Sequence, residues 1–199
     1  MILPIVAYGD AVLRTTGEEI TLQYPDLQAL IANMFETMYN ARGVGLAAPQ
    51  VGLSIRLFIV DTLQLTNEKD NDDDDHDGLK NSQPIKKVFI NARILEQNGK
   101  MLHYSEGCLS IPTVREDVKR KETVTIRYCD EQFNYSEETY EGLTARVILH
   151  EYDHIEGILF TDHLSPIKKQ LLKKRLERIS KGQVEAEYRM RFPQMGRKR

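Results

Sequence analysis

The feature that most restricts how this chain can fold is an apolar run that leads into a pair of histidines. The segment Leu143–Gly157 contains no proline, and Val147, Ile148 and Leu149 come directly before the sequence His-Glu-Tyr-Asp-His. A helix that is apolar around most of its circumference is buried rather than laid on a surface. We therefore expect a largely buried helix here, with Gly142 as its N-cap, around which the rest of the chain packs.

Two further helices are expected on either side of this segment. Apolar residues at helical spacing predict a helix around Tyr24–Asn40, with Pro25 in its first turn and Gly43 after its end. A basic amphipathic helix is expected over Ser165–Gln183, with Ser165 at the N-cap. Its apolar stripe consists of Leu171, Leu172, Leu176 and Ile179.

Runs of β-branched and aromatic residues predict short strands. The expected strands are Ile55–Asp61, Val88–Ile94, Glu122–Tyr128 and a hairpin partner at Asn134–Glu141. The segment Gly43–Gln50 is expected to be a turn, because it has few bulky side chains. The elements together predict an α+β fold, in which short antiparallel or mixed strands pack around the buried central helix and an amphipathic helix lies near the C-terminus.

The chain is long enough for one well-filled core, so residues 1–188 are assigned to a single domain. Residues 66–84 are expected to form a flexible acidic loop inside it, and residues 189–199 a frayed basic tail. The aspartates at 73, 75 and 77 match the first half of a calcium-binding loop. Pro84 stands where that loop needs a glutamate ligand, so we interpret the acidic run as solvated.

Composition argues against several classes of protein. No apolar run approaches the ~18–20 residues that span a membrane, and the first residues lack the basic start of a signal peptide. The net charge of −3 gives no indication of binding to DNA. The two cysteines cannot form a disulfide framework and favour a reducing compartment. We therefore expect a cytoplasmic protein with neither membrane nor DNA as a partner.

The paired histidines are the strongest signal for chemistry. On a helix, His150 and His154 lie one turn apart on one face, so that both imidazoles can bind one cation. Glu151 then lies close to any water on that metal. Ordinary polar residues on a core helix can produce the same pattern by chance.

A catalytic metal site usually has three protein ligands, so a third must come from elsewhere in the chain. Where one class of zinc peptidase has a third histidine, this chain has Phe160, and His163 comes three residues too late. Glu177 is available but lies in a basic, exposed-looking segment. Cys108 remains, and a thiolate is a strong ligand for late transition metals. The alternative for Cys108 is a buried apolar role, which is our interpretation of Cys129.

Cys108 lies in Glu106–Ser110, which reads Glu-Gly-Cys-Leu-Ser. The earlier segment Gly43–Gln50 has small residues that let a ligand approach the backbone, and Gln50 offers an amide suited to polarising a carbonyl. By itself that segment also fits a simple turn with a surface glutamine. With the histidine pair, and in this order and separation, these segments resemble the three signature motifs of peptide deformylase. The resemblance extends from about residue 3 to residue 180.

The resemblance implies hydrolysis of the formyl group on the N-terminal methionine of new proteins, with release of formate. It implies that Cys108, His150 and His154 bind one divalent metal, with water in the fourth position. Glu151 is the implied general acid and base. The Gln50 side chain and the Leu109 backbone N–H are the implied donors to the oxyanion.

The resemblance also implies how the substrate is bound. Backbone groups near Gly45 and Leu109 would pair with an extended N-formylmethionyl nascent peptide. The candidates for the methionine pocket are Val44, Leu143 and Val147, although Leu143 is equally suited to plain core packing. Arg115 resembles a substrate-contacting arginine, and a solvated surface arginine is the alternative. Arg146 stands where some members are apolar, which leaves the polarity of the pocket open.

The metal is not fixed by a ligand set of one cysteine and two histidines. The resemblance implies Fe²⁺ in the cell, whereas zinc, nickel or cobalt also suit these ligands. The basic helix Ser165–Gln183 is a candidate for contact with ribosomal RNA, although a charged run is usually a solvated face. Two other functions are alternatives: a peptidase that cuts internal bonds, and a metal-binding module whose site has a purely structural role.

Overall fold

The computed structural model describes residues 1–67 and 82–193 of the chain. Its largest element is a five-stranded antiparallel sheet in the order β2-β3-β4-β5-β6. The strands are β2 (Gly45–Ala47), β3 (Leu57–Asp61), β4 (Lys86–Cys108), β5 (Ile111–Cys129) and β6 (Tyr135–Glu141). A separate parallel pair joins β1 (Ile5–Val6) to β7 (Met190–Arg191) near the two ends of the chain.

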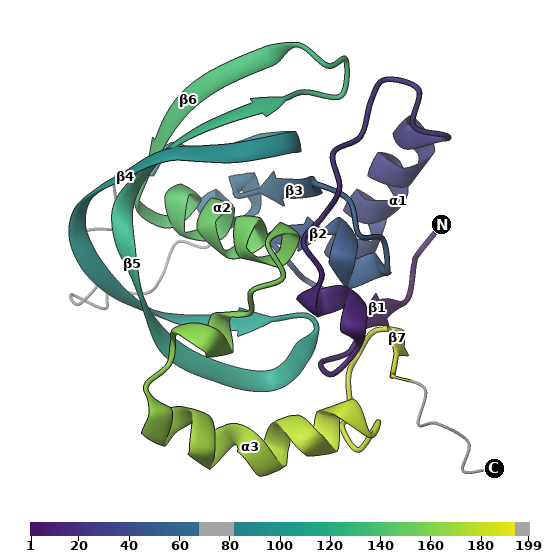
Figure 1. The fold of residues 1–199 in the computed structure, drawn as a ribbon, viewed down its shortest axis with the longest axis vertical. Coiled ribbons are helices and arrows are strands. Elements are labelled where there is room, and N and C mark those ends of the chain that lie inside the picture. Colours follow the sequence, from purple (N-terminus) through teal and green to yellow (C-terminus); the bar gives the residue numbers. More distant parts are fainter. Residues whose placement is uncertain (68–81, 194–199) are drawn as a thin grey trace.

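Three α-helices complete the fold. They are α1 (Leu27–Asn40), α2 (Gly142–Ile155) and α3 (Pro166–Ser180). Short 3-10 helices occupy Ala11–Arg14, Ala48–Val51, Leu63–Asn67 and Phe160–His163. The long strands β4 and β5 bend around α2, as Figure 1 shows, and most residues of α2 are buried. The α+β class predicted from the sequence is therefore confirmed, with an antiparallel sheet and three helices.

The prediction of uniformly short strands is wrong for β4 and β5, which have 23 and 19 residues. The predicted Val88–Ile94 covers only the buried start of β4, and residues 95–101 are exposed. The ladder with β5 continues along this exposed part, for example at Met101 and Lys121. Backbone pairing with a distant segment, rather than an apolar pattern, therefore holds this half of the strand.

The prediction of a turn over Gly43–Gln50 is also wrong. Its centre is the buried strand β2, which pairs with β3, and a 3-10 helix follows at Ala48. Small side chains are suitable here because α1 and α2 both pack against β2.

The helix ends differ from their predicted positions. Pro25 precedes α1 instead of lying in its first turn, and Asp26 is the N-cap. The left-handed residue after α1 is Arg42, with φ 55°, and not Gly43. Gly142 is the first residue of α2 rather than its cap.

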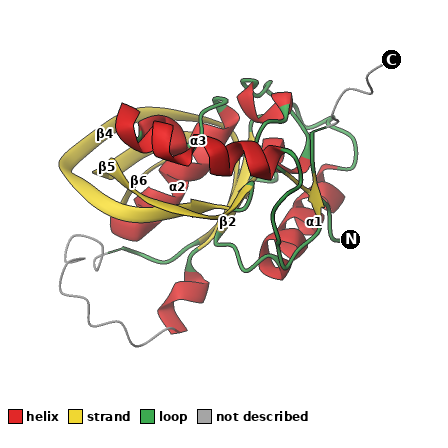
Figure 2. Cartoon of the chain, turned by 90° about the horizontal axis from the view of Figure 1, so that it is seen from below, coloured by secondary structure: helices red, strands yellow, loops and turns green. Residues whose placement is uncertain are grey.

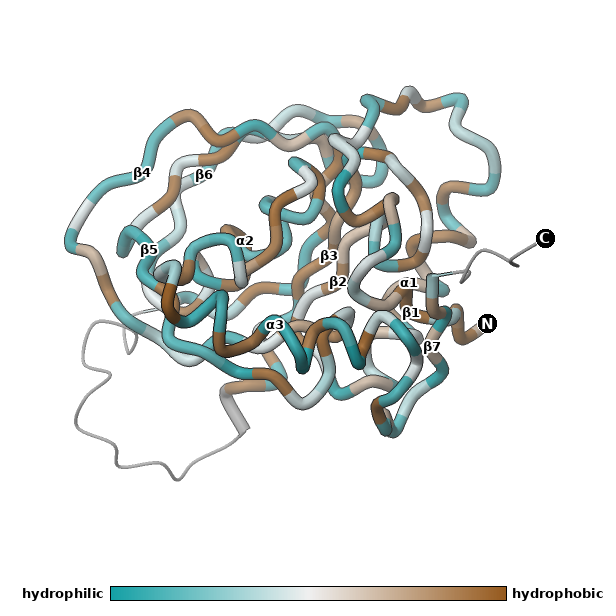
Figure 3. Tube along the Cα trace, turned by 60° about the horizontal axis from the view of Figure 1, so that its bottom comes forward, coloured by the Kyte–Doolittle hydropathy of each residue, from teal (hydrophilic) through white to brown (hydrophobic). Residues whose placement is uncertain are grey.

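The C-terminal amphipathic helix begins as predicted, since the Ser165 side chain accepts a hydrogen bond from the Lys168 amide. Figure 2 shows α3 crossing the outside of the sheet, and Figure 3 shows hydrophilic and hydrophobic residues interspersed along it. Leu172, Leu176 and Ile179 are buried, but Leu171 is 76% exposed and does not belong to the apolar stripe.

The predicted frayed tail starts with an ordered segment, because Met190 and Arg191 form β7. Residues 194–199 lie outside the described part of the chain, as does most of the predicted acidic loop, including the aspartates of its partial calcium motif. The described helices include none that is long and apolar enough to cross a membrane.

Candidate metal centre and active-site cleft

Three side chains able to bind a metal meet where the end of β4 reaches α2. Cys108 is the last residue of β4, and His150 and His154 lie one turn apart on α2. The Cys108 Sγ lies 3.3 Å from His154 Nε2, and the ligand atoms of the three residues all lie within 4.8 Å of one another. The structure thus brings together the three ligands that the sequence pattern predicts.

The chemistry of this cluster suits a late transition metal. His150 Nδ1 lies 3.0 Å from Glu106 Oε2, which leaves its Nε2 for a cation. Burial opposes ionisation of the Cys108 thiol, but His154 and His150 lower its pKa to about 5, so the ligand form predominates at neutral pH. One thiolate and two imidazoles with an open side match the donor set of a catalytic metal site.

Glu151 lies beside the cluster on α2. Burial raises the pKa of Glu151 to about 7, while the two histidines oppose this shift. Its Oε2 atom is buried and has no hydrogen-bond partner among the described residues. A buried carboxyl oxygen of this kind calls for a polar partner, such as a water or a substrate group. A carboxyl with a pKa near neutrality can both accept and return a proton.

Gly45 makes room for Glu151. A Cβ atom at this position would lie 2.6 Å from Glu151 Oε1, which is closer than the two atoms can approach. Gly45 also starts β2, so its backbone borders the cleft described below. Any side chain here would therefore displace the carboxylate.

Gln50 reaches the cluster from the 3-10 helix that follows β2. Its Oε1 accepts a hydrogen bond from the Ala47 amide at 2.8 Å, which orients the side chain. Its Nε2 then faces Cys108 Sγ at 3.5 Å. Gln50 is 1% exposed, so the donor is held beside the cluster instead of moving in solvent. Leu109 follows Cys108 in the turn between β4 and β5 and borders the same space.

A single cleft of about 1100 Å³ opens beside the cluster. Every predicted site residue lines it except His154. The lining includes Val44, Gly45, Gln50, Cys108, Leu109, Arg115, Leu143, Val147, His150 and Glu151. Arg115 is exposed, and its guanidinium donates to the Ser105 carbonyl at 2.8 Å.

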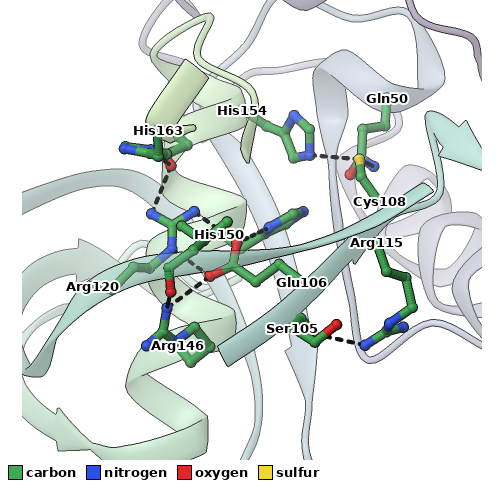
Figure 4. A network of polar contacts seen from close by, with 12 residues as sticks. Gln50, Ser105, Glu106, Cys108, Arg115, Arg120, Arg146, His150, His154 and His163 are labelled. Carbon is green, nitrogen blue, oxygen red and sulfur yellow. Dashed lines mark hydrogen bonds and ion pairs between the residues drawn. The ribbon is translucent and has the colours of Figure 1, made fainter. Parts of the chain in front are cut away.

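A buried ionic network that sequence reasoning missed supports His150 (Figure 4). Glu106 accepts hydrogen bonds from Arg120 Nε at 2.7 Å and from Arg146 Nη1 at 3.0 Å, besides its contact with His150. Burial works against the charge on Glu106, but His150 and Arg120 hold its pKa well below the usual range. The carboxylate therefore stays ionised and fixes the His150 ring.

The same network accounts for the charge of Arg146, whose position left the polarity of the pocket open. Its guanidinium also donates to the carbonyls of Leu102 and Val118, at 2.7 and 3.0 Å, so its charge is already paired where it borders the cleft. Arg120 extends the network to Asp153 at 2.7 Å, and Asp153 contacts His163 at 2.8 Å. His163 therefore has a partner outside the metal cluster. The one sequence signal for this network was Arg146, a charged residue within the apolar first half of the helix.

The cleft has a further wall that the sequence did not indicate. The segment Glu185–Tyr188, which follows α3, lines the cleft, as does Asn40 at the end of α1. The Tyr188 hydroxyl donates to the Leu109 carbonyl at 2.8 Å. Burial and the neighbouring Cys108 raise the pKa of Tyr188, so the hydroxyl keeps its proton.

A buried cysteine and two histidines, with a carboxyl group and an amide donor at the edge of a cleft, define a metal-dependent hydrolase. Comparison with known proteins identifies the family. The model of the polypeptide deformylase family matches residues 2–170. A peptide deformylase from Flavobacterium johnsoniae is 57% identical over 192 residues, covering 96% of each chain. The one from Cytophaga hutchinsonii is 52% identical, over 97% of this chain and 98% of the other.

Solved structures agree with this result. A peptide deformylase from Legionella pneumophila superposes with a TM-score of 0.75 at 36% identity, covering 92% of this chain and 98% of the other. A plant peptide deformylase gives a TM-score of 0.77 at 31% identity, over 90% of each chain. The chain belongs to the peptide deformylase family, whose metal-dependent members remove the formyl group from the N-terminal methionine of nascent proteins. The resemblance predicted from the three motifs is thereby confirmed.

Proposed function

We propose that Cys108, His150 and His154 hold the single catalytic metal of this deformylase at the end of α2. The observation that carries the proposal is the convergence of their three ligand atoms within 4.8 Å. The ion pair between Glu106 and His150 supports it, because a ligating histidine generally gives its second ring nitrogen to such a carboxylate. A purely structural site would have no use for Glu151 and Gln50, which border the same cluster.

The side chains around the ligands have separate tasks. When bound, a divalent metal lowers the pKa of its water from ~15.7 toward ~7 and polarises the formyl oxygen. Glu151 accepts the proton of the attacking water and later delivers it to the leaving amine. The Gln50 amide and the Leu109 N–H donate to the oxygen that becomes negative, and losing one such donor costs about 3 kcal/mol of transition-state stabilisation. Formate and a free N-terminal methionine are the products.

The substrate is an N-formylmethionyl nascent peptide in an extended conformation. Val44, Leu143 and Val147 supply apolar surface to the cleft and are the proposed lining of the methionine pocket. Backbone groups of Gly45 and Leu109 are available for pairing along the peptide. Arg115 is exposed at the cleft, which suits a contact with a peptide carbonyl beyond the methionine.

The proposal includes Fe²⁺ as the metal in the cell. Iron and the Cys108 thiolate are both sensitive to oxidation, so the native enzyme should lose activity in air. Zinc, nickel or cobalt suit the same ligands and are expected to replace iron in aerobically purified protein. Metal analysis of anaerobically and aerobically purified protein, set beside activity, tests this choice.

Formate release from formyl-Met-Ala-Ser by anaerobically purified protein tests the function. We expect the wild type to release formate, and Glu151→Ala to release almost none while it keeps its metal content and melting temperature. Loss of metal in the variant would assign Glu151 a structural role instead. Cleavage of unformylated peptides at internal bonds would favour a peptidase.

We also assign residues 1–188 to one catalytic domain that acts in the cytoplasm, with residues 66–84 as a loop in it and residues 189–199 as its basic tail. Ribosome contact through α3 is a further part of the proposal, because Lys169 and Lys173 are exposed one turn apart. Deleting α3 would also remove Leu172 and Leu176 and uncover the apolar cluster on which they pack, so charge reversal is the cleaner test. Lys169→Glu with Lys173→Glu should weaken ribosome binding without changing hydrolysis of a free peptide, and unchanged binding would exclude this contact.

A further inference from the structure

The chain returns to the active-site cleft after α3 and is fixed there on both sides of Tyr188. Downstream, the Ile5 and Ala7 amides donate to the carbonyls of Arg189 and Arg191, at 2.9 and 2.8 Å. Upstream, Val184 packs against the apolar cluster beneath α3, together with Met190 and Phe192 from beyond Tyr188. The segment Glu185–Tyr188 is therefore a permanent part of the cleft wall.

Tyr188 contacts the backbone of Leu109, in the turn between β4 and β5. Its hydroxyl donates to the carbonyl of Leu109 at 2.8 Å, and the side chain is only partly exposed. Leu109 lies in the two-residue turn between Cys108 and Ile111, which are the last paired positions of β4 and β5. The strand ladder therefore ends on either side of Leu109 and does not hold its peptide groups.

Leu109 has two neighbours that limit its movement. Its side chain packs beside Gly43, where an added Cβ would lie 2.9 Å from Leu109 Cδ1. Its carbonyl is bound by Tyr188. The Tyr188 hydrogen bond holds the peptide unit between Leu109 and Ser110, and the Leu109 N–H lies in the adjoining unit between Cys108 and Leu109. Only the two backbone torsions of Leu109 join these planar units, so holding the first unit limits how the N–H can turn. The oxyanion donor must already point at the reacting oxygen, because reorientation during the reaction is costly.

We propose that Tyr188 is a positioning residue, which orients Leu109 so that its N–H can stabilise the oxyanion. This inference rests on the proposed role of Leu109. Tyr188 itself does not contact the reacting atoms, so its effect reaches the reaction only through the backbone of the turn. Interactions made only in the transition state appear in kcat and leave KM unchanged.

Steady-state kinetics of Tyr188→Phe on formyl-Met-Ala-Ser, with the metal-loaded enzyme, tests the inference. The variant keeps the ring and loses only the hydroxyl. We expect kcat to fall roughly tenfold, with KM and metal content unchanged, since loss of a whole oxyanion donor costs roughly 10²–10³. Tyr135→Phe is the matched control, because Tyr135 is 81% exposed on β6, and it should behave as wild type.

The possible results separate this inference from the proposed function. An unchanged kcat in Tyr188→Phe, with an active wild type, overturns the role of Tyr188 alone. A raised KM with unchanged kcat also overturns it and makes Tyr188 a substrate contact. A wild type without formate release overturns the proposed function and this inference together. If the variant melts early, the comparison is made well below its melting temperature.

Discussion

At the scale of single residues, Glu106 links the buried arginines to the site, because one carboxylate contacts two arginines and a histidine. It is 5% exposed and binds Arg120, Arg146 and His150 with its two carboxylate oxygens. Two buried arginines need a buried negative charge, because an unpaired charge in the interior is strongly destabilising. One carboxylate therefore both offsets the charge of two buried arginines and sets the orientation of His150, a proposed metal ligand.

Glu106→Gln should weaken metal binding on the order of 10–100-fold, the usual effect of losing such an outer partner. The free energy of unfolding should also fall by about 3–5 kcal/mol, since buried Arg146 loses its carboxylate partner and Arg120 keeps Asp153 but loses Glu106. Competition with a chelator measures the affinity, and denaturant unfolding measures the stability. Glu116→Gln is the control, because Glu116 lies opposite Glu106 in the β4–β5 ladder but, among the described residues, its side chain pairs with Lys168 instead of the network. Equal metal affinity in both variants would contradict this role of Glu106.

At the scale of elements, a polar cluster joins three strands of the sheet. Glu138 on β6 accepts hydrogen bonds from Lys87 on β4 at 2.7 Å, from Tyr128 on β5 at 2.8 Å, and from Tyr140 at 2.6 Å. Burial raises the pKa of Glu138, but the bonds from Lys87 and the tyrosines outweigh this and lower it below the usual value. The ionised form therefore stabilises the attachment of β6 to the sheet.

A lowered folded pKa means that this stabilisation is complete above the unfolded pKa of ~4.3 and is lost as the pH falls through the folded value. Glu138→Gln should therefore be less stable than wild type by about 1 kcal/mol near neutral pH, a value that allows for solvent screening at this half-exposed site. The difference should shrink at pH values below ~4.3. Melting curves against pH measure it, with Glu137→Gln on the exposed face as control. A difference that stays constant with pH would contradict this assignment.

At the scale of the whole molecule, segments near the two ends of the chain pair with each other as β1 and β7. The β1–β7 pair holds the C-terminal segment against the N-terminal one, and that segment supplies a wall of the cleft. Arg42 and Glu187, which both line the cleft, also form an ion pair at 3.1 Å, but both side chains are about four-fifths exposed and the pair adds little stability. The strand pair therefore fixes this wall, and the surface ion pair does not.

A chain that ends at Tyr188 should lose about 2 kcal/mol of stability, because two backbone hydrogen bonds and the packing of Phe192 disappear. Its kcat should fall at least as far as that of Tyr188→Phe, since the tyrosine is still present but no longer anchored. Chemical denaturation and formate release measure the two effects. A chain that ends at Pro193 keeps every described contact and serves as control. Full activity in the shorter chain would mean that β7 is not needed to hold the wall.

The chemistry of the site could be predicted from the sequence because it depends on short-range spacing. His150 and His154 are one helical turn apart in any α-helix, and Glu151 between them follows the same geometry. Cys108 could be selected because few other residues of the chain offer a suitable third ligand. The α+β class likewise follows from local patterns, since each buried strand and helix has its own apolar period.

The tertiary structure decided the features that depend on contacts between distant segments. The exposed half of β4 exists because β5 pairs with it, and no local pattern marks a polar strand. The network around Glu106 joins β4, β5 and α2, so its partners lie 14 to 44 residues away in the chain. Tyr188 meets Leu109 across 79 residues, because β7 pairs with β1. The sequence by itself therefore determined the candidate metal ligands and the reaction class, whereas long-range pairing decided what orients them.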